Sequence, residues 1–119
     1  MNKTKKLVFT LLSLVFVICM FTVTASAATY KYNNQNLEIK TEGDWQYVFL
    51  TEAALTDADK EMGINAGEVY ITKYTGTAAS VNVPSVLGGK SVSTIGKVSF
   101  KENKAVQTVT VSSSVKYID

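Results

Sequence analysis

Five oxygen-bearing side chains between Asp57 and Glu68 follow the spacing of a calcium-binding loop. In an EF-hand register, positions 1, 3, 5, 9 and 12 are occupied by Asp57, Asp59, Glu61, Asn65 and Glu68. Position 6 is Met62, where the loop needs glycine for its sharp turn, and Gly63 follows one place late. The residues after Glu68 also have the pattern of a strand rather than a helix. We therefore favour a solvated acidic loop without a bound metal, with calcium binding as the alternative.

This chain contains few of the residue types that catalysis usually requires. The absence of His excludes a Ser-His-Asp or Cys-His pair and any histidine-ligated metal. The single cysteine, Cys19, excludes a disulfide framework and a cysteine-rich zinc site. The 10 acidic residues are scattered, and no cleft is expected across which two of them could hydrolyse a glycoside. We predict that the protein is not an enzyme and binds no cofactor.

Aromatic side chains gather before residue 75 and could stack against sugars. They are Tyr30, Tyr32, Trp45, Tyr47, Phe49, Tyr70 and Tyr74. Exposed on one face, such rings would form a platform for carbohydrate. The same rings could fill the core of a small β domain, which is the interpretation we favour. A small secreted carbohydrate-binding module is the alternative function.

Residues 1–27 have the three-part order of a secretory signal peptide. A start with three lysines precedes an apolar run over 7–23, and an Ala-Ser-Ala motif ends at Ala27. We expect cleavage after Ala27. The alternative is that 7–23 stays as an uncleaved anchor and makes a membrane-tethered structural protein.

Removal of the signal segment would change the charge balance. It takes away Cys19 and three of the 12 lysines, leaving nine lysines against ten acidic residues over 28–119. The resulting net charge of −1 gives no basic patch for nucleic acid. We therefore expect no nucleic-acid partner, and contact with a membrane only through an uncleaved signal segment.

The part of the chain after the signal segment shows strand periodicity. Apolar residues alternate over 45–50 and recur over 68–74, and Gly43-Asp44 has the composition of a turn. We expect the two runs to pair antiparallel. Their connection, 51–67, is long for a hairpin, and Glu52-Ala53-Ala54-Leu55 within it could form a short helical turn.

The second half of the chain contains an internal repeat. Apolar residues at 78, 81 and 83 match those at 106, 109 and 111, at an offset of 28. Further on, 92–95 matches 115–118 at an offset of 23. The difference falls on 87–90, Leu-Gly-Gly-Lys, which is a turn by composition. A unit of about 23 residues with one short strand is typical of a leucine-rich repeat.

This repeat resembles that of the BspA-like leucine-rich repeat proteins, a surface-antigen type found in bacteria and some protists. The family pattern reads apolar-x-apolar-Pro, Val-x-x-Ile-Gly, Ala-Phe, then Cys or Asn, then Leu. Its positions are matched here by Pro84, Ile95, Gly96, Phe100, Asn103 and Val106, with Ser99 in place of Ala. The resemblance covers 68–119. It is weaker in the second unit, where Ser112 replaces Pro and Asp119 replaces Gly.

The resemblance implies a mainly β fold, with an antiparallel N-terminal cap over 28–77 followed by the start of a solenoid. One full repeat would occupy 78–105, and a partial second repeat 106–119. It also implies a secreted or cell-surface protein without catalytic activity, whose partner is a protein or a glycan. Because a stable array usually needs at least three repeats, we expect this chain to be a fragment of a longer one.

Several residues of the repeat have roles that follow from their chemistry. Asn103 can bond backbone groups of the adjacent coil, and Gly96 suits a backbone position with positive φ. Pro84 has no N–H to donate and should end its strand. The solenoid core is expected to contain Val81, Val83, Ile95, Phe100 and Val106.

Four polar residues are expected to point outward from the two repeat strands. They are Ser80, Asn82, Thr108 and Thr110. In a curved array they would lie on the concave face, which is the usual binding surface of solenoids. We predict that this face binds the protein or glycan partner, although any one of the four could be a solvated strand position.

Overall fold

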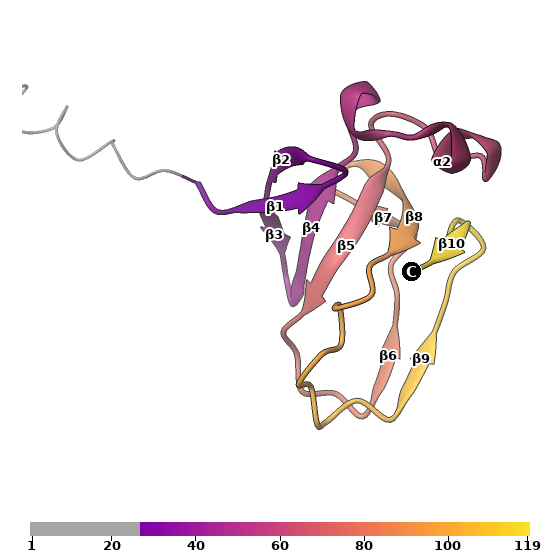
Figure 1. Ribbon diagram of the computed structural model, residues 1–119. Coiled ribbons are helices and arrows are strands. Elements are labelled where there is room, and N and C mark those ends of the chain that lie inside the picture. Colours follow the sequence, from indigo (N-terminus) through magenta and orange to yellow (C-terminus); the bar gives the residue numbers. More distant parts are fainter. Residues whose placement is uncertain (1–26) are drawn as a thin grey trace, which may run out of the picture.

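The computed structural model describes residues 27–119. Short strands predominate in it, joined by tight turns and two short helices (Figure 1). The predicted signal segment, 1–27, lies outside the described residues apart from Ala27. Over 27–119, no helix is long and apolar enough to cross a membrane.

The described chain begins with a tight hairpin. β1 (Thr29–Tyr32) pairs antiparallel with β2 (Gln35–Glu38) across Asn33-Asn34, whose φ angles are 45° and 65°. Positive φ at both central residues is the geometry of a type I′ turn, which asparagine tolerates better than most residues. The two asparagines therefore fix the register of this hairpin.

A second hairpin leads into the central sheet. β3 (Lys40–Glu42) pairs with β4 (Trp45–Phe49) across Gly43-Asp44, which confirms the turn predicted there. β4 then pairs antiparallel with β5 (Val69–Tyr74), as predicted for the two apolar runs. Because side chains alternate along these strands, their apolar residues serve both faces of the sheet.

The connection between β4 and β5 contains two short helices. The predicted helical turn is a 3₁₀ helix, η1 (Glu52–Ala54), and α2 (Asp57–Glu61) follows it. The Thr56 side chain accepts a hydrogen bond from the N–H of Asp59, and the Asp59 carboxylate accepts one from the N–H of Thr56. This reciprocal capping box satisfies two donors that would otherwise be unpaired, and so stabilises a very short helix.

Parallel strand pairs build the remainder of the fold. β6 (Ser80–Asn82) pairs with β9 (Thr108–Thr110). β8 (Lys90–Ile95) pairs with β5 on one side and with β10 (Tyr117–Ile118) on the other. In Figure 1 the chain winds from β5 through β6 to β8, and again through β9 to β10. Two successive coils are thus stacked on the cap.

The register of these pairs matches the offsets read from the sequence. Val81 faces Val109 at the offset of 28, and Ile95 faces Ile118 at the offset of 23. The two offsets differ because the first coil contains an additional hairpin. In it, β7 (Val86–Leu87) pairs with β8 across Gly88-Gly89. The fold is therefore mainly β, with an antiparallel cap followed by the start of a leucine-rich-repeat solenoid, as predicted.

The parallel ladder begins inside the cap. Ile71 on β5 faces Ile95, just as Ile95 faces Ile118 one coil later. The N–H of Gly96 bonds to the carbonyl of Ile71 at 2.9 Å, and the N–H of Asp119 bonds to that of Ile95 at the same distance. β5 thus serves as the last antiparallel strand of the cap and the first strand of the ladder.

Two apolar clusters lie on opposite faces of β4 and β5. The cluster on the repeat side includes Tyr47, Val69, Ile71, Val83, Val92 and Ile95. The cluster on the hairpin side includes Leu37, Val48, Leu50, Ile64 and Tyr70. Of the predicted repeat core, Val81, Val83 and Ile95 are buried, whereas Phe100 and Val106 are half-buried.

The prediction for the backbone of Gly96 is wrong, because its φ is not positive. Glycine is needed there for a different reason. A Cβ at this position would lie 2.6 Å from the ring of Tyr70, well inside van der Waals contact. Gly96 therefore allows the first coil to approach a tyrosine of the cap.

Candidate functional site

The four residues predicted to bind a partner lie side by side on β6 and β9. They face one another as two pairs, Ser80 with Thr108 and Asn82 with Thr110, and all four are exposed. The valines between them point to the opposite side of the strands, toward the interior of the coil. We call these four residues the polar face.

Bonds between the two coils hold the polar face in place. The N–H of Thr108 bonds to the carbonyl of Ala79 at 3.0 Å, and the N–H of Val83 bonds to that of Thr110 at 2.8 Å. The side chains of Val81 and Val83 are buried and anchor β6 to the core. Neighbouring strands are about 4.8 Å apart, so one partner can contact both rows of side chains.

Asn103 sets the corner before β9, as predicted. Its Nδ2 donates to the carbonyl of Gly76, at the end of the cap, at 2.9 Å. Its Oδ1 accepts from the N–H groups of Ala105 and Val106 at 3.0 and 3.2 Å. Ser99 adds a bond from its buried hydroxyl to the carbonyl of Ile71 at 2.9 Å. Both side chains tie the first coil to the cap.

The polar face consists of neutral groups. Hydroxyl and amide groups donate and accept hydrogen bonds, but they do not exchange protons near neutral pH. Such a surface is suited to recognising hydroxyl-rich or backbone-like groups of a partner. In the part of the chain that the structure describes, no three His, Cys, Asp or Glu side chains gather as a metal site requires.

The acidic segment that resembles a calcium loop has partners within the protein. Asp59 is buried in the cap of α2, where the Tyr32 hydroxyl donates to its carboxylate at 3.1 Å. The side-chain amide of Asn33 also reaches this carboxylate, at 3.3 Å. The carboxylate of Asp59 therefore joins α2 to the first hairpin.

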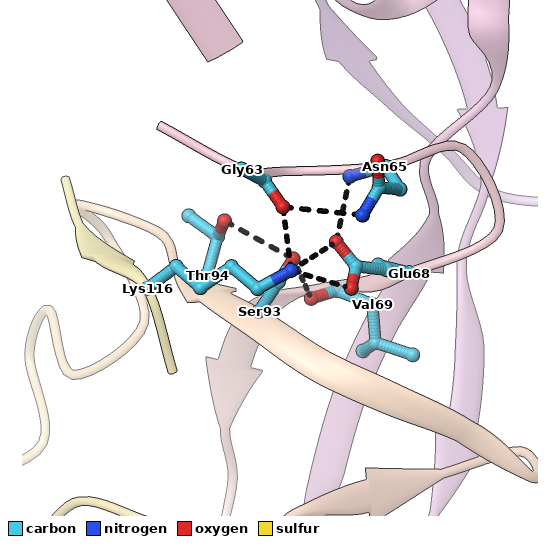
Figure 2. A network of polar contacts seen from close by, with 7 residues as sticks. All are labelled: Gly63, Asn65, Glu68, Val69, Ser93, Thr94 and Lys116. Carbon is cyan, nitrogen blue, oxygen red and sulfur yellow. Dashed lines mark hydrogen bonds and ion pairs between the residues drawn. The ribbon is translucent and has the colours of Figure 1, made fainter. Parts of the chain in front are cut away.

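The other end of that segment is bound to the second coil through Lys116 (Figure 2). The Lys116 ammonium lies 3.0 and 3.2 Å from the two carboxylate oxygens of Glu68, and it also donates to the carbonyl of Gly63. Glu68 accepts a further bond from the N–H of Asn65 at 2.6 Å. A lysine ammonium group thus supplies the positive charge that these oxygens attract. We call these four residues the Lys116 clamp.

The aromatic residues considered as a sugar platform are packed within the cap. All seven are buried or half-buried. The ring centroids of Tyr32 and Tyr70 lie 5.0 Å apart, edge to face. Burial raises the pKa of Tyr32 to about 12, and the hydrogen bond to Asp59 and the charge of its carboxylate add to the shift. Burial likewise raises the pKa of Tyr70, whose hydroxyl also bonds to that of Tyr30. These rings pack against one another and stabilise the cap.

Comparison with known proteins gives one structural similarity. No family model matches the chain, and no curated protein matches it. Among solved structures, it is similar to the crystal structure of a leucine-rich cell surface protein from Faecalibacterium prausnitzii A2-165. The identity is 28%, the TM-score is 0.47, and the match covers 67% of this chain. The chain spans 19% of the length of that protein.

Proposed function

We propose that this is an exported, non-catalytic leucine-rich repeat protein of the BspA-like type, which binds a protein or glycan partner at the cell surface. The observation that carries the proposal is the polar face. Two parallel strands in register present paired Ser, Asn and Thr side chains to solvent, and the valine of β6 beneath them is buried. Solenoids bind their partners through such repeated surfaces.

The export part of the proposal rests on the basic, apolar and Ala-Ser-Ala order of residues 1–27. Intact-mass analysis of the native product tests it. A product in the medium that begins at Ala28 is expected. A product in the membrane fraction that begins at Met1 would instead establish the tethered alternative.

The binding part is tested with mucin as the probe, immobilised either intact or after enzymatic removal of its glycans. The double change Asn82→Lys with Thr110→Lys places two long cations in the polar face. We expect binding to fall at least tenfold, because the bulky charged chains cover the short polar groups. If the intact probe alone is bound, the partner is a glycan, and if both forms are bound, it is a protein.

A matched control uses Asn36→Lys with Thr41→Lys, which adds the same charges at exposed strand positions of the cap. We expect this variant to bind the probe like the unmodified chain. Unchanged binding by the Asn82, Thr110 variant would remove the polar face from the site.

A further inference from the structure

A hollow of the surface lies between the cap and the first coil. One wall is the end of β5, and the other is the loop over 98–103 that follows β8 (Figure 1). The N–H of Tyr74 donates to the carbonyl of Ser99 at 2.8 Å and holds the two walls together. Because β5 and β10 pair with opposite edges of β8, the second coil stacks away from this hollow. We call it the β5 hollow.

Charged residues line the β5 hollow. It has two adjoining parts, of about 240 and 290 Å³, and Lys73, Lys101 and Glu102 line both of them. The two lysines are exposed, and within residues 27–119 neither forms an ion pair with Glu102 or with any other acid. The lining thus has a net charge of +1, from two lysines and one glutamate. Such a local excess of positive charge attracts an anion.

Thr72 adds a buried hydroxyl to the smaller part of the hollow. Ile71 and Lys73 pair with consecutive residues of β4, so Thr72 between them is an additional residue, a β-bulge. Bulges redirect side chains and often occur beside functional sites. Thr72 is 4% exposed, and among the described residues its Oγ1 has no hydrogen-bond partner. A buried hydroxyl without a partner is unfavourable, and a ligand oxygen in the hollow would supply the acceptor that it lacks.

We propose that the β5 hollow binds a sulfate group of a glycan. The ammonium groups of Lys73 and Lys101 attract the anion, and the hydroxyl of Thr72 donates a hydrogen bond to one of its oxygens. A sulfate ester has acceptor oxygens and a single negative charge, which balances the net charge of the lining. A phosphate monoester carries a charge of about −1.5 to −2 at pH 7 and would leave a negative excess beside Glu102. The hollow shares no residue with the polar face, so either proposal can fail alone.

The larger part of the hollow favours a glycan over a sulfated protein. Its lining includes Thr75 and Asn103 besides the three charged residues, whereas Tyr74, which also lines it, is only 6% exposed. These polar groups suit a sugar ring that carries hydroxyls. The ring of a sulfated tyrosine would instead remove them from water without offering hydrogen bonds, which is unfavourable. The sulfate group would therefore lie beside Thr72, and the sugar ring beside Thr75.

Calorimetry of the native product with heparin tests the proposal, and fully desulfated, N-acetylated heparin, which keeps its carboxylates, is the reference glycan. We expect binding of heparin alone. The double change Lys73→Met with Lys101→Met keeps the aliphatic stems and should weaken binding by about tenfold or more, because both ammonium groups are lost. Lys31→Met with Lys90→Met changes the charge equally at exposed positions of β1 and β8, and should weaken binding by less than about threefold. Equal binding of the two glycans, or equal losses in the two double variants, would overturn the proposal.

Two further variants distinguish this site from a general attraction between charges. Thr72→Val keeps the shape of the side chain but removes its hydroxyl. We expect heparin binding to weaken by about threefold or more while the melting temperature stays the same or rises, because an unpaired buried group is gone. Thr72→Ser, which restores a hydroxyl, should restore binding. Glu102→Gln removes the negative charge from the lining and should strengthen binding by about threefold. Unchanged affinity in Thr72→Val, or weaker binding in Glu102→Gln, would contradict the proposal.

Discussion

The two coils of this protein carry the same apolar positions but bury them differently. Val81, Val83 and Ile95 of the first coil are enclosed by the coil that follows, whereas the equivalent residues of the second coil are exposed. Backbone pairing is the same in both, since the bond from Gly96 to Ile71 recurs one coil later. The apolar repeat pattern therefore specifies the direction in which a side chain points. How deeply that side chain is buried depends on whether another coil packs against it.

This difference shows how a solenoid distributes its stability. In a repeat array, each unit contributes its own folding energy and an interface with its neighbours. The first coil has an interface on both sides, one with the cap through β5 and one with the second coil. Within the described residues, 27–119, the second coil has one such interface. Changes at equivalent positions should thus have unequal effects.

The largest effect is expected from truncating the isoleucine that both coils share. Ile95→Ala removes a buried side chain from the main cluster and should lower the free energy of unfolding by about 2–5 kcal/mol. Ile118→Ala at the equivalent exposed position should lower it by less than about 1 kcal/mol. Urea unfolding measures both values. Equal losses at the two positions would contradict the difference in burial.

An intermediate effect is expected at Asn103, which joins the first coil to the cap and holds the corner before β9. Asn103→Ala removes the donor to the Gly76 carbonyl and the acceptor for two N–H groups. Gly76 is buried, and Ala105 and Val106 are half-buried, so we expect the unpaired groups to cost about 1–3 kcal/mol in urea unfolding. Asn36→Ala, an exposed asparagine on β2, is the control and should change stability by less than about 0.5 kcal/mol. Similar losses for both would mean that the bonds of Asn103 do not stabilise the junction between the first coil and the cap.

The repeat could be predicted from the sequence because stacked parallel strands require matched residues in register. Val81 and Val109 occupy the same position in successive coils, so their spacing in the sequence is the spacing of the ladder. The polar face follows from the same register, since residues on either side of an inward valine must point outward. The residue pattern does not name a partner. The binding role of the polar face therefore stays a proposal.

Other features depend on contacts that have no sequence period. β5 pairs with strands on both sides, and its nearly continuous apolar run fits an antiparallel cap strand as well as a ladder strand. The need for Gly96 arises from the ring of Tyr70, which is distant in sequence. α2 has five residues, too few to show a helical repeat. Its formation depends on the capping box, which the spacing of Thr56 and Asp59 could have indicated.

The smallest effect is expected at the Lys116 clamp, which attaches the second coil to the loop before β5. Lys116→Met keeps the aliphatic stem but removes the ammonium group from Glu68 and Gly63. The Lys116 side chain is 34% exposed, so solvent screens the pair and we expect a loss of less than about 1 kcal/mol. Because salt screens exposed charges, the difference should shrink in 1 M NaCl, where the Debye length is about 3 Å. Lys104→Met, an exposed lysine before β9, is the control.

The Lys116 clamp also gives a test of calcium binding by the loop over 57–68. The ammonium group already contacts Glu68 and Gly63, two of the oxygen sources that a bound cation in this loop would use. The melting temperature of the unmodified chain should therefore be the same in 1 mM CaCl₂ and in EDTA. A rise with calcium would show that the metal displaces Lys116, and it would restore the calcium loop. A rise confined to Lys116→Met would show instead that the lysine excludes the ion, because removing the tethered charge leaves the carboxylate of Glu68 free to bind one.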